Sequence, residues 1–463
     1  MKRVLFVAYY FPPVAASGAM RPLGFCRHLH SYGWEASVLT TTPESVYPAH
    51  SVDHRLAEKV PAAVRVYRAA YQDTRLRLLS LREKARRMIG LRSPISDVHD
   101  VSDGTANASQ RPRSFVKDTI IEWTCAFPDP QTSWFSAAVR HGTEQEKHAV
   151  PDAIVATGGP WTSFLVGRAL AKRFDRPLIL DYRDPWTCNP FYSFTANFLT
   201  RKAQHLERTI CLGASRIVTN TDELRERLCI EYPEIKHKSL MIPNGFDAET
   251  IALSSGQSTV RRTVNAQGYE LCHFGSVYGK RTPLVLLQAI LELQEEIALT
   301  PEQLRLRFVG AWDSADQECN RLAVSLESRG FLRREPPISH EKCLHQMKDA
   351  QVLLVVQPES PLQVPGKIYE YIAMGRPLLL VGGEGATANL VRHYHLGASC
   401  SNSIGDVKRL LRRIVEGTET IPVPNQERVK RFDYRSLTGE LAALLDSVVA
   451  GQRVSHSYDS SGG

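Results

Sequence analysis

Short apolar runs alternate with helical segments along this chain in two successive blocks, and this alternation restricts the possible folds more than any other feature. Most runs are rich in Val, Ile and Leu and lack strict polar alternation, which is typical of parallel strands covered on both faces. The first block contains VLFVA (4–8), ASVLTT (36–41), DAIVAT (152–157), PLILDY (177–182) and RIVTN (216–220). Expected helices lie between these runs, near 21–32, after Gly158-Gly159-Pro160 and over about 194–212. The block predicts a doubly wound α/β domain.

A second block repeats the pattern after IPNGFD (242–247). Its expected strands are YELCHFG (269–275), LRFVG (306–310), VLLVVQ (352–357) and PLLLV (377–381), with helices near 283–296 and 315–329. A chain of 463 residues also exceeds what one hydrophobic core normally supports. We therefore predict an α/β fold of two doubly wound Rossmann-like domains.

Composition shifts give the expected domain boundaries. The N-terminal Rossmann-like domain is expected over 1–245, with a loop-rich insertion at about 70–135, and the C-terminal one over 246–430. Residues 431–450 are predicted to form a helix that packs back on the N-terminal domain. The polar, small-residue segment 451–463 is predicted to be a disordered tail.

The overall composition excludes several classes of protein. Hydrophobic residues make up 43% and charged residues 23% of the chain, as in soluble globular proteins, and no apolar run has membrane-spanning length. The nine cysteines show no CxxC spacing, which indicates reduced thiols in a cytosolic protein. We find no metal-ligand constellation, so no metal or other cofactor is expected. The net charge of +8 favours an anionic partner, but no nucleic-acid-binding module is present.

The segment VPGKIYEYIAMGRP (364–377) is the most informative motif. A helix is expected to begin at Gly366 and to end at Gly375, between two apolar strands. Lys367 and Glu370 share one face of it, at the strand edge where open α/β sheets bind ligands. Free N–H groups, a glycine and a lysine together suit a phosphate, and the glutamate could accept hydrogen bonds from ribose hydroxyls. A solvated Lys–Glu pair is the alternative, and both interpretations stay open at this point.

The loop after the first strand argues against a dinucleotide-binding enzyme. A dehydrogenase would carry GxGxxG there, whereas FPPVAASGAMRP (11–22) holds the single glycine Gly18. In the second block, Lys280 and Arg281 follow the first strand, again at a carboxyl end.

Six segments together resemble family 4-type glycosyltransferases of the GT-B fold, and the likeness covers nearly the whole chain. They are FVAYYFPPVAASGAMRP (6–22), PDAIVATGGPWTSFLVG (151–167), LILDYRDPW (178–186), MIPNGFD (241–247), HFGSVYGKRTP (273–283) and VPGKIYEYIAMGRP. The resemblance implies two Rossmann-like domains facing a central cleft. It also implies an acceptor in the N-terminal domain and a nucleotide-sugar donor in the C-terminal domain.

The resemblance gives the motif residues roles in donor binding. Lys367 is expected to face the donor's pyrophosphate and Glu370 its ribose, with Gly366 at the start of that helix. Lys280 and Arg281 are expected to join Lys367 in neutralising the leaving diphosphate through charge-assisted hydrogen bonds. A solvated Lys-Arg turn is the alternative for these two.

The first domain is expected to contribute further groups. Backbone N–H groups at Ser17 and Gly18 would reach the donor's distal phosphate, or the segment is a plain tight turn. Arg21 would add charge there, or lie on the surface. In DYRDPW, Asp184 is predicted to orient the acceptor hydroxyl, with Asp181 as a second candidate; a structural Asp–Arg pair is the alternative.

The resemblance also implies a reaction. Family 4 enzymes retain the anomeric configuration, and no carboxylate here is marked as a covalent nucleophile, so a front-face attack is expected. Leu362 stands where many members carry a second glutamate, eight positions before Glu370, that contacts the donor sugar. The expected product is a bacterial-type surface polysaccharide or related glycan. A GT-B sugar-nucleotide epimerase and a non-catalytic nucleotide-sugar binder are the alternatives.

One basic segment indicates binding to a membrane surface. RLRLLSLREKARRMIGLR (75–92) carries seven basic residues, one glutamate and an apolar stripe at helical spacing. Such a helix suits an anionic membrane surface, although an ordinary domain helix has a similar pattern. We therefore expect a cytoplasmic protein, peripheral on the inner face of the plasma membrane, that meets a glycan or lipid-linked acceptor.

Overall fold

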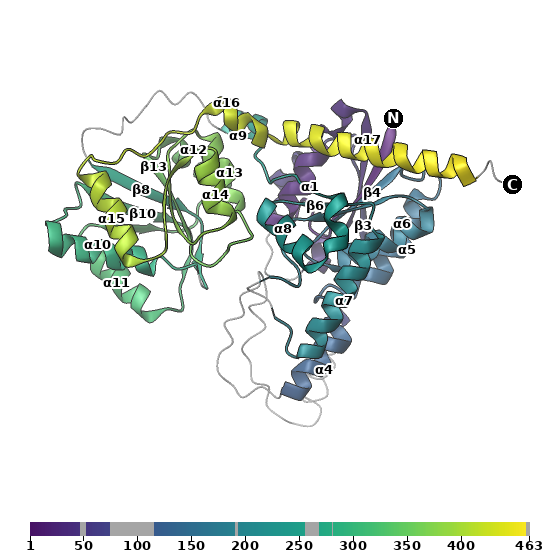
Figure 1. The fold of residues 1–463 in the computed structure, drawn as a ribbon, viewed down its shortest axis with the longest axis horizontal. Helices are drawn as coiled ribbons and strands as arrows, with labels where there is room; N and C mark the ends of the chain where they lie inside the picture. Colours follow the sequence, from purple (N-terminus) through teal and green to yellow (C-terminus); the bar gives the residue numbers. More distant parts are fainter. Residues whose placement is uncertain (47–51, 75–114, 190–192, 255–267, 280, 460–463) are drawn as a thin grey trace. The chain divides into compact units, whose positions relative to one another are not determined.

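The structure is a computed structural model, and it describes residues 1–46, 52–74, 115–189, 193–254, 268–279 and 281–459 (Figure 1). Two compact units divide the chain: unit 1 is Met1–Asn244 with Arg435–Gly463, and unit 2 is Gly245–Tyr434. The predicted membrane segment 75–92 and the candidate Lys280 lie outside the described residues.

Unit 1 is built on a seven-stranded sheet in which all neighbouring strands are parallel, in the order β3-β2-β1-β4-β5-β6-β7. The strands are β1 (Lys2–Val7), β2 (Trp34–Thr41), β3 (Arg65–Ala69), β4 (Ala153–Thr157), β5 (Leu178–Tyr182), β6 (Arg216–Thr219) and β7 (Ser239–Met241). The five predicted strands of the first block are confirmed. Sequence order reverses between β1 and β4, which makes the carboxyl ends of these strands the expected binding edge.

Helices connect these strands and cover the sheet, as in a doubly wound fold (Figure 1). They are α1 (Ser17–His28), α2 (His54–Glu58), α4 (Phe115–Cys125), α5 (Trp134–Glu146), α6 (Thr162–Phe174), α7 (Asn197–Gly213) and α8 (Asp222–Glu231). The start of α6 shows how local chemistry fixes a boundary. The buried Asp129 accepts hydrogen bonds from the backbone N–H of Thr162 (2.7 Å) and from its hydroxyl (2.7 Å), so one of the unpaired amides of the first turn is satisfied.

Unit 2 has a six-stranded sheet of parallel neighbours in the order β12-β10-β8-β13-β14-β15. These strands are β8 (Tyr269–Phe274), β10 (Leu304–Val309), β12 (Leu332–Glu335), β13 (Val352–Gln357), β14 (Leu378–Gly382) and β15 (Gly397–Cys400). A short pair, β9 (Val277–Tyr278) and β11 (Trp312–Asp313), follows β8 and β10. The order reverses between β8 and β13, so the expected binding edge of unit 2 lies where these two strands end.

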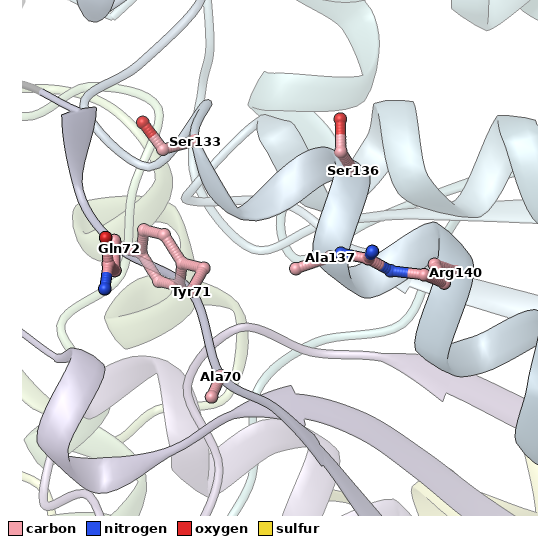
Figure 2. A pocket seen from close by; sticks show the side chains of 7 residues that line it. All are labelled: Ala70, Tyr71, Gln72, Ser133, Ser136, Ala137 and Arg140. Atoms are coloured by element: carbon pink, nitrogen blue, oxygen red, sulfur yellow. The ribbon is translucent and has the colours of Figure 1, made fainter.

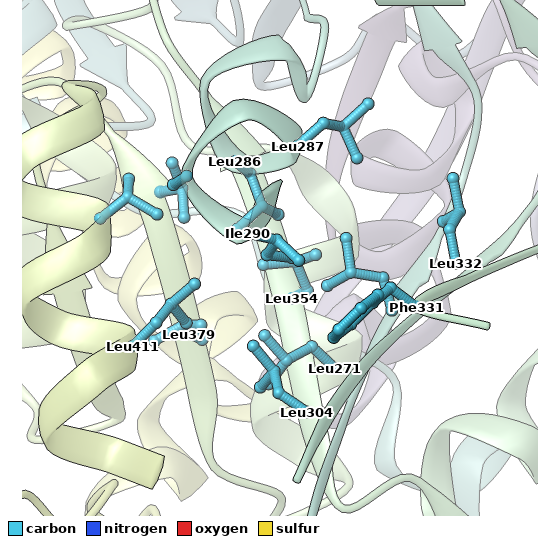
Figure 3. Packing of buried hydrophobic residues seen from close by; sticks show 14 of the residues in the cluster. Leu271, Leu286, Leu287, Ile290, Leu304, Phe331, Leu332, Leu354, Leu379 and Leu411 are labelled. Atoms are coloured by element: carbon cyan, nitrogen blue, oxygen red, sulfur yellow. The ribbon is translucent and has the colours of Figure 1, made fainter. Parts of the chain in front are cut away.

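Both faces of the unit 2 sheet carry a hydrophobic core. The helices of the unit are α9 (Ala248–Ser254), α10 (Leu284–Ile297), α11 (Gln317–Ser328), α12 (His340–Asp349), α13 (Gly366–Ala373), α14 (Ala386–His393), α15 (Ile404–Val415) and α16 (Gln426–Val429). On one face, side chains of α10 and α15 such as Ile290 and Leu411 pack against Leu271 and Leu379 of the sheet (Figure 3). On the other face, Ile368 and its neighbours on α13 pack against the same strands. The apolar face of α13 therefore fixes the direction of its polar face.

The long helix α17 (Tyr434–Asp459) ends the described chain and belongs, from Arg435, to unit 1. Asp446 accepts hydrogen bonds from Nζ of Lys2 (2.6 Å) and Nε1 of Trp34 (3.0 Å), so α17 lies at the amino ends of β1 and β2. Helix α17 continues through Gly451–Asp459, which belong to the segment predicted to be a disordered tail. A single glycine costs a helix only about 1 kcal/mol relative to alanine, and Gln452, Arg453 and Val454 do not end it.

Candidate functional site

The first candidate site lies in unit 2, where β8 and β13 end at the reversal of strand order. The helix α13 begins at Gly366, and its second residue, Lys367, lies beside the end of β8. Gly366 is exposed, and a Cβ atom there would meet nothing within 4 Å. Packing therefore does not require this glycine, which leaves the start of α13 open to an approaching group.

Lys367 is held by a histidine that the sequence analysis gave no role. Nζ of Lys367 lies 2.9 Å from Nε2 of His273, the penultimate residue of β8. The other ring nitrogen, Nδ1, lies 3.1 Å from the carbonyl oxygen of Leu354 in β13. A carbonyl oxygen can only accept, so Nδ1 carries the hydrogen and Nε2 presents a lone pair to the lysine. Burial and the neighbouring Lys367 hold the pKa of His273 well below its ordinary value, so the ring is neutral.

Two cationic side chains converge at this point. Burial, followed by the nearby charge of Arg281, lowers the pKa of Lys367 to about 7. Arg281 is itself positioned by Tyr278, whose hydroxyl accepts a hydrogen bond of 2.9 Å from Nη1. Within the described part of the chain, no carboxylate forms an ion pair with either Lys367 or Arg281. A pair of uncompensated cations beside a helix N-terminus attracts an anion.

Glu370 faces a different partner. Its Oε1 lies 2.8 Å from Nε2 of His340, the first residue of α12, and its side chain is 26% exposed. Lys367 and Glu370 therefore take separate partners, and the alternative of a simple Lys–Glu pair on the helix surface is not what the structure shows. A second carboxylate oxygen remains for a hydroxyl group of a ligand.

The second candidate site lies at the carboxyl ends of the strands in unit 1, where Arg183 is the central group. Its Nη2 donates to the carbonyl oxygen of Gly159 (2.9 Å), and its Nη1 lies 3.1 Å from Oδ2 of Asp184. A Cβ atom on Gly18 would lie 2.8 Å from Cζ of Arg183, so the glycine makes room for the guanidinium. Ser17 is exposed at the first residue of α1. The predicted phosphate role of Ser17 and Gly18 stays a prediction.

Arg21 does not lie where either interpretation from the sequence placed it. It is 2% exposed, and its Nε and Nη2 donate to Asp181 at 2.8–3.1 Å. The remaining donors reach the carbonyl oxygens of Ile242 (2.9 Å) and Pro243 (2.7 Å). Arg21 is therefore neither a surface residue nor a free charge beside the donor: it joins α1, β5 and the segment after β7. The structural Asp–Arg alternative for DYRDPW is also supported, because Arg183 pairs with Asp184 (3.1 Å), whose side chain is 31% exposed.

A third feature is a pocket of about 420 Å³ in unit 1, between the end of β3 and α5 (Figure 2). Its lining residues are Ala70, Tyr71, Gln72, Ser133, Ser136, Ala137 and Arg140. The hydroxyls of Tyr71 and Tyr9 lie 2.7 Å apart, which ties the pocket to the loop after β1. The pocket thus belongs to the same carboxyl edge as Asp184, and no sequence motif indicated it.

Three residues of the candidate sites were not predicted from the sequence: His273, Arg183 and His340. His273 had one usable signal, because it is a polar residue near the end of an otherwise apolar strand, YELCHF. Arg183 lay inside DYRDPW, but the interpretation assigned chemistry only to the aspartates. His340 had no signal, because its position opposite Glu370 depends on how α12 packs.

The described residues contain neither a candidate metal site nor a candidate membrane-spanning helix. No three His, Cys, Asp or Glu side chains in those ranges gather into a group that could hold a metal ion. No helix in the same part of the chain is both long and apolar enough to cross a lipid bilayer.

The chain is similar to known proteins in sequence. The family model described as Glycosyltransferase Family 4 matches residues 96–250. A D-inositol 3-phosphate glycosyltransferase of Kineococcus radiotolerans is 24% identical over 247 residues, which are 52% of this chain and 54% of that protein. The chain thus spans about half the length of this curated relative.

Solved structures show the same fold at low sequence identity. HepE of Anabaena, solved in complex with UDP, is 16% identical with a TM-score of 0.57, over 96% of this chain and 100% of that one. A sucrose-phosphate synthase of Thermosynechococcus elongatus is 15% identical with a TM-score of 0.60, over 97% and 100%. Together with the family match, these similarities confirm the resemblance to family 4-type glycosyltransferases, and the chain has the GT-B fold.

Proposed function

We propose that this protein is a retaining, family 4-like glycosyltransferase that moves a sugar from a nucleotide-sugar donor to an acceptor hydroxyl. The observation that carries the proposal is the convergence of Lys367 and Arg281 at the carboxyl edge of unit 2. Neither cation forms an ion pair with a carboxylate among the described residues; Lys367 lies in the first turn of α13, and the charge of Arg281 acts on it. That HepE was solved with UDP supports a nucleotide ligand for this fold.

In this proposal, unit 2 binds the donor. Lys367 and Arg281 donate charge-assisted hydrogen bonds to the diphosphate, each contributing about 1.5–3 kcal/mol. Glu370 accepts hydrogen bonds from the ribose through the oxygen that His340 does not use. Lys280 and Gly366 complete the donor-binding set, and Ser17 and Gly18 offer backbone N–H groups to the distal phosphate.

The chemical step needs positioning and charge stabilisation. The acceptor oxygen bonds to the anomeric carbon on the face from which the diphosphate leaves, as the bond from that carbon to the phosphate oxygen breaks. The acceptor proton passes to the departing phosphate oxygen, and the negative charge that develops on the diphosphate is stabilised by Lys367 and Arg281. Asp184, which pairs with Arg183 at the carboxyl edge, orients the acceptor hydroxyl, whereas Asp181 is buried against Arg21.

We assign the acceptor to unit 1. The pocket beside Tyr71 and Arg140 offers an aromatic ring, hydroxyls and a cation, which suit a sugar or a phosphate-linked sugar. A bacterial-type surface polysaccharide or related glycan is the proposed product class. The protein would act without a metal ion, because fixed cations replace it.

A glycosyltransferase, an epimerase and a non-catalytic binder differ in the products that they form from a nucleotide sugar. In a panel of UDP-, GDP-, ADP- and dTDP-sugars, measured in EDTA, we expect one donor to raise the melting temperature of the protein. A ligand at ~100 times its Kd adds ~2.7 kcal/mol to the free energy of unfolding. With that donor and a panel of sugars and polyprenyl-phosphate-linked sugars, we expect nucleoside diphosphate release that requires an acceptor. Product analysis should give a new glycoside with the donor's anomeric configuration.

Each other outcome rejects part of this proposal. An isomerised donor without acceptor identifies an epimerase, and binding without turnover identifies a binder. A donor effect that EDTA abolishes and Mg²⁺ restores excludes the metal-free mechanism.

We further propose that the protein is cytoplasmic and binds the inner face of the plasma membrane. The basic segment 75–92 precedes α4, and α4 presents an exposed apolar stripe: Val116, Ile120 and Trp123 are each more than half exposed. Trp123 packs edge-on against Phe198 of α7 (6.0 Å), and Nζ of Lys202 lies 5.7 Å from its ring. Exposed aromatic rings beside basic residues suit the interface of an anionic membrane.

Flotation with phosphatidylglycerol vesicles tests this membrane proposal. We expect the wild type to float at low salt, and a variant with Ile120→Glu and Trp123→Glu to remain in solution. Ile230→Glu, which changes an even more exposed apolar residue on α8, is the control and should float. A second variant changes Arg82, Arg86 and Arg87 to Glu. Flotation by all variants alike, or by none of the proteins including wild type, would reject membrane binding.

A further inference from the structure

The imidazole of His273 lies directly beside Lys367 and has no role in the proposed reaction. We propose that His273 is a positioning residue, whose Nε2 lone pair holds the Lys367 amine at the place where the diphosphate binds. This inference rests on the proposed function, because it deepens the account of the same donor site. In this account His273, which does not touch the ligand, fixes the Lys367 amine in place before the ligand binds.

The ring of His273 cannot turn away from the lysine. Its Nδ1–H donates to Leu354 in the adjacent strand (3.1 Å), and its face stacks on Phe308 with ring centroids 4.9 Å apart. The residue is 3% exposed, so water does not compete for its nitrogens. The hydrogen bond from Nδ1–H therefore fixes which nitrogen is free, and Nε2 points at Nζ of Lys367 (2.9 Å).

The backbone beside this pair leaves space for it. Gly275 has a φ of +134°, a conformation that side chains rarely adopt. A Cβ atom there would lie 3.1 Å from Nζ of Lys367 and 3.9 Å from Nε2 of His273. Gly275, which follows β8, thus leaves the lysine amine uncovered by a side chain at this position.

A histidine with a purely structural role would need only its hydrogen bond to Leu354. The structural role and the positioning role therefore predict different changes in the pKa of Lys367 when His273 is replaced. Lys367 is surrounded by His273 on β8, Arg281 after β9, Cys343 on α12 and Glu370 one turn along α13. Arg281 disfavours the ammonium form, whereas the acceptor Nε2 favours it. Removing the lone pair should therefore lower the pKa of Lys367 further, whereas a purely structural role would leave the titration unchanged.

Two substitutions of His273 test the roles of its two ring nitrogens separately. His273→Asn keeps a donor near the Nδ1 position for Leu354 and removes the acceptor at Nε2. His273→Gln places its side-chain oxygen near the Nε2 position and so keeps an acceptor for the lysine. Inorganic pyrophosphate is a suitable probe, because its binding does not depend on the nucleotide base.

We expect His273→Asn to weaken pyrophosphate binding about ten- to a hundredfold, and His273→Gln to retain most of it. The affinity of the wild type should fall as pH rises above about 7, where Lys367 loses its proton. In His273→Asn this fall should begin at lower pH, and in His273→Gln it should begin near the wild-type value. Equal affinity and equal pH profiles in all three proteins would overturn the proposal, as would equal losses in both variants.

A second readout does not need a ligand. The rate at which an acylating reagent modifies Lys367, followed by mass spectrometry across pH, reports the fraction of neutral amine. Its midpoint should move to lower pH in His273→Asn and return in His273→Gln. If the wild type binds no pyrophosphate, the proposed function fails while this readout still tests His273; if the midpoints coincide, the positioning role fails alone.

Discussion

Replacing Lys367 with alanine is expected to lower turnover about 10²–10³-fold, the usual effect of removing one preorganised donor from a site where charge develops. The amine lies in the first turn of α13 and is held by His273, so the substitution removes a fixed cation from the proposed diphosphate site. Steady-state kinetics with the preferred donor and acceptor measure the loss. Glu370→Gln should instead raise KM for the donor more than it lowers kcat.

Lys342→Ala is the matched control for this prediction. Lys342 is an exposed lysine on α12, in the same unit but outside the set around Lys367. We expect its turnover to remain within about twofold of the wild type, as is usual for surface substitutions. Full activity in Lys367→Ala would reject the role of Lys367 on which the proposed function rests.

Replacing Arg21 with methionine is expected to lower the free energy of unfolding by about 3–5 kcal/mol, because it leaves Asp181 buried without its partner. Both side chains are nearly inaccessible, at 2% and 4% exposed. The change also removes the hydrogen bonds to Ile242 and Pro243, which hold the end of unit 1's sheet to α1. Denaturant unfolding measures the loss.

Two further variants make the Arg21 result specific. Adding Asp181→Asn to Arg21→Met should restore part of the stability, because the uncompensated charge disappears. Arg225→Met, which removes an exposed ion pair with Asp222 on α8, should cost less than about 1 kcal/mol. If Arg21→Met keeps its stability and loses donor affinity, Arg21 belongs to the donor site after all.

The strands were predictable where burial alone decides their sequence. VLLVV (352–356) and PLLLV (377–381) are apolar throughout because both faces of the unit 2 sheet are covered. The edge strand β3 reads RVYRA, and β7 has only three residues, so neither carries an apolar run. These edge strands could be recognised only from their neighbours.

The candidate site was predictable in its charges and not in its contacts. The glycine-lysine start of α13 is a local pattern, and local rules place Lys367 at the binding edge. The partners of Lys367 and Glu370, by contrast, come from residues about 94 and 30 positions away in the chain. Arg21 illustrates the same limit, because the sequence shows a basic residue near a helix start and gives no sign of the carboxylate 160 positions later.

The return of the chain into unit 1 has a consequence for synthesis. Phe246, just after the chain leaves unit 1, is hydrogen-bonded to Phe432 and Tyr434, just before it returns, so unit 2 is inserted between adjacent points of backbone. The ribosome therefore makes about 200 residues between the last strand of unit 1 and α17. At about 5–20 residues per second, this stretch takes roughly 10–40 s to make, and Lys2 and Trp34 lack Asp446 throughout it. During that interval α17 does not yet cover the amino end of the unit 1 sheet on the nascent chain, and a chaperone can bind there.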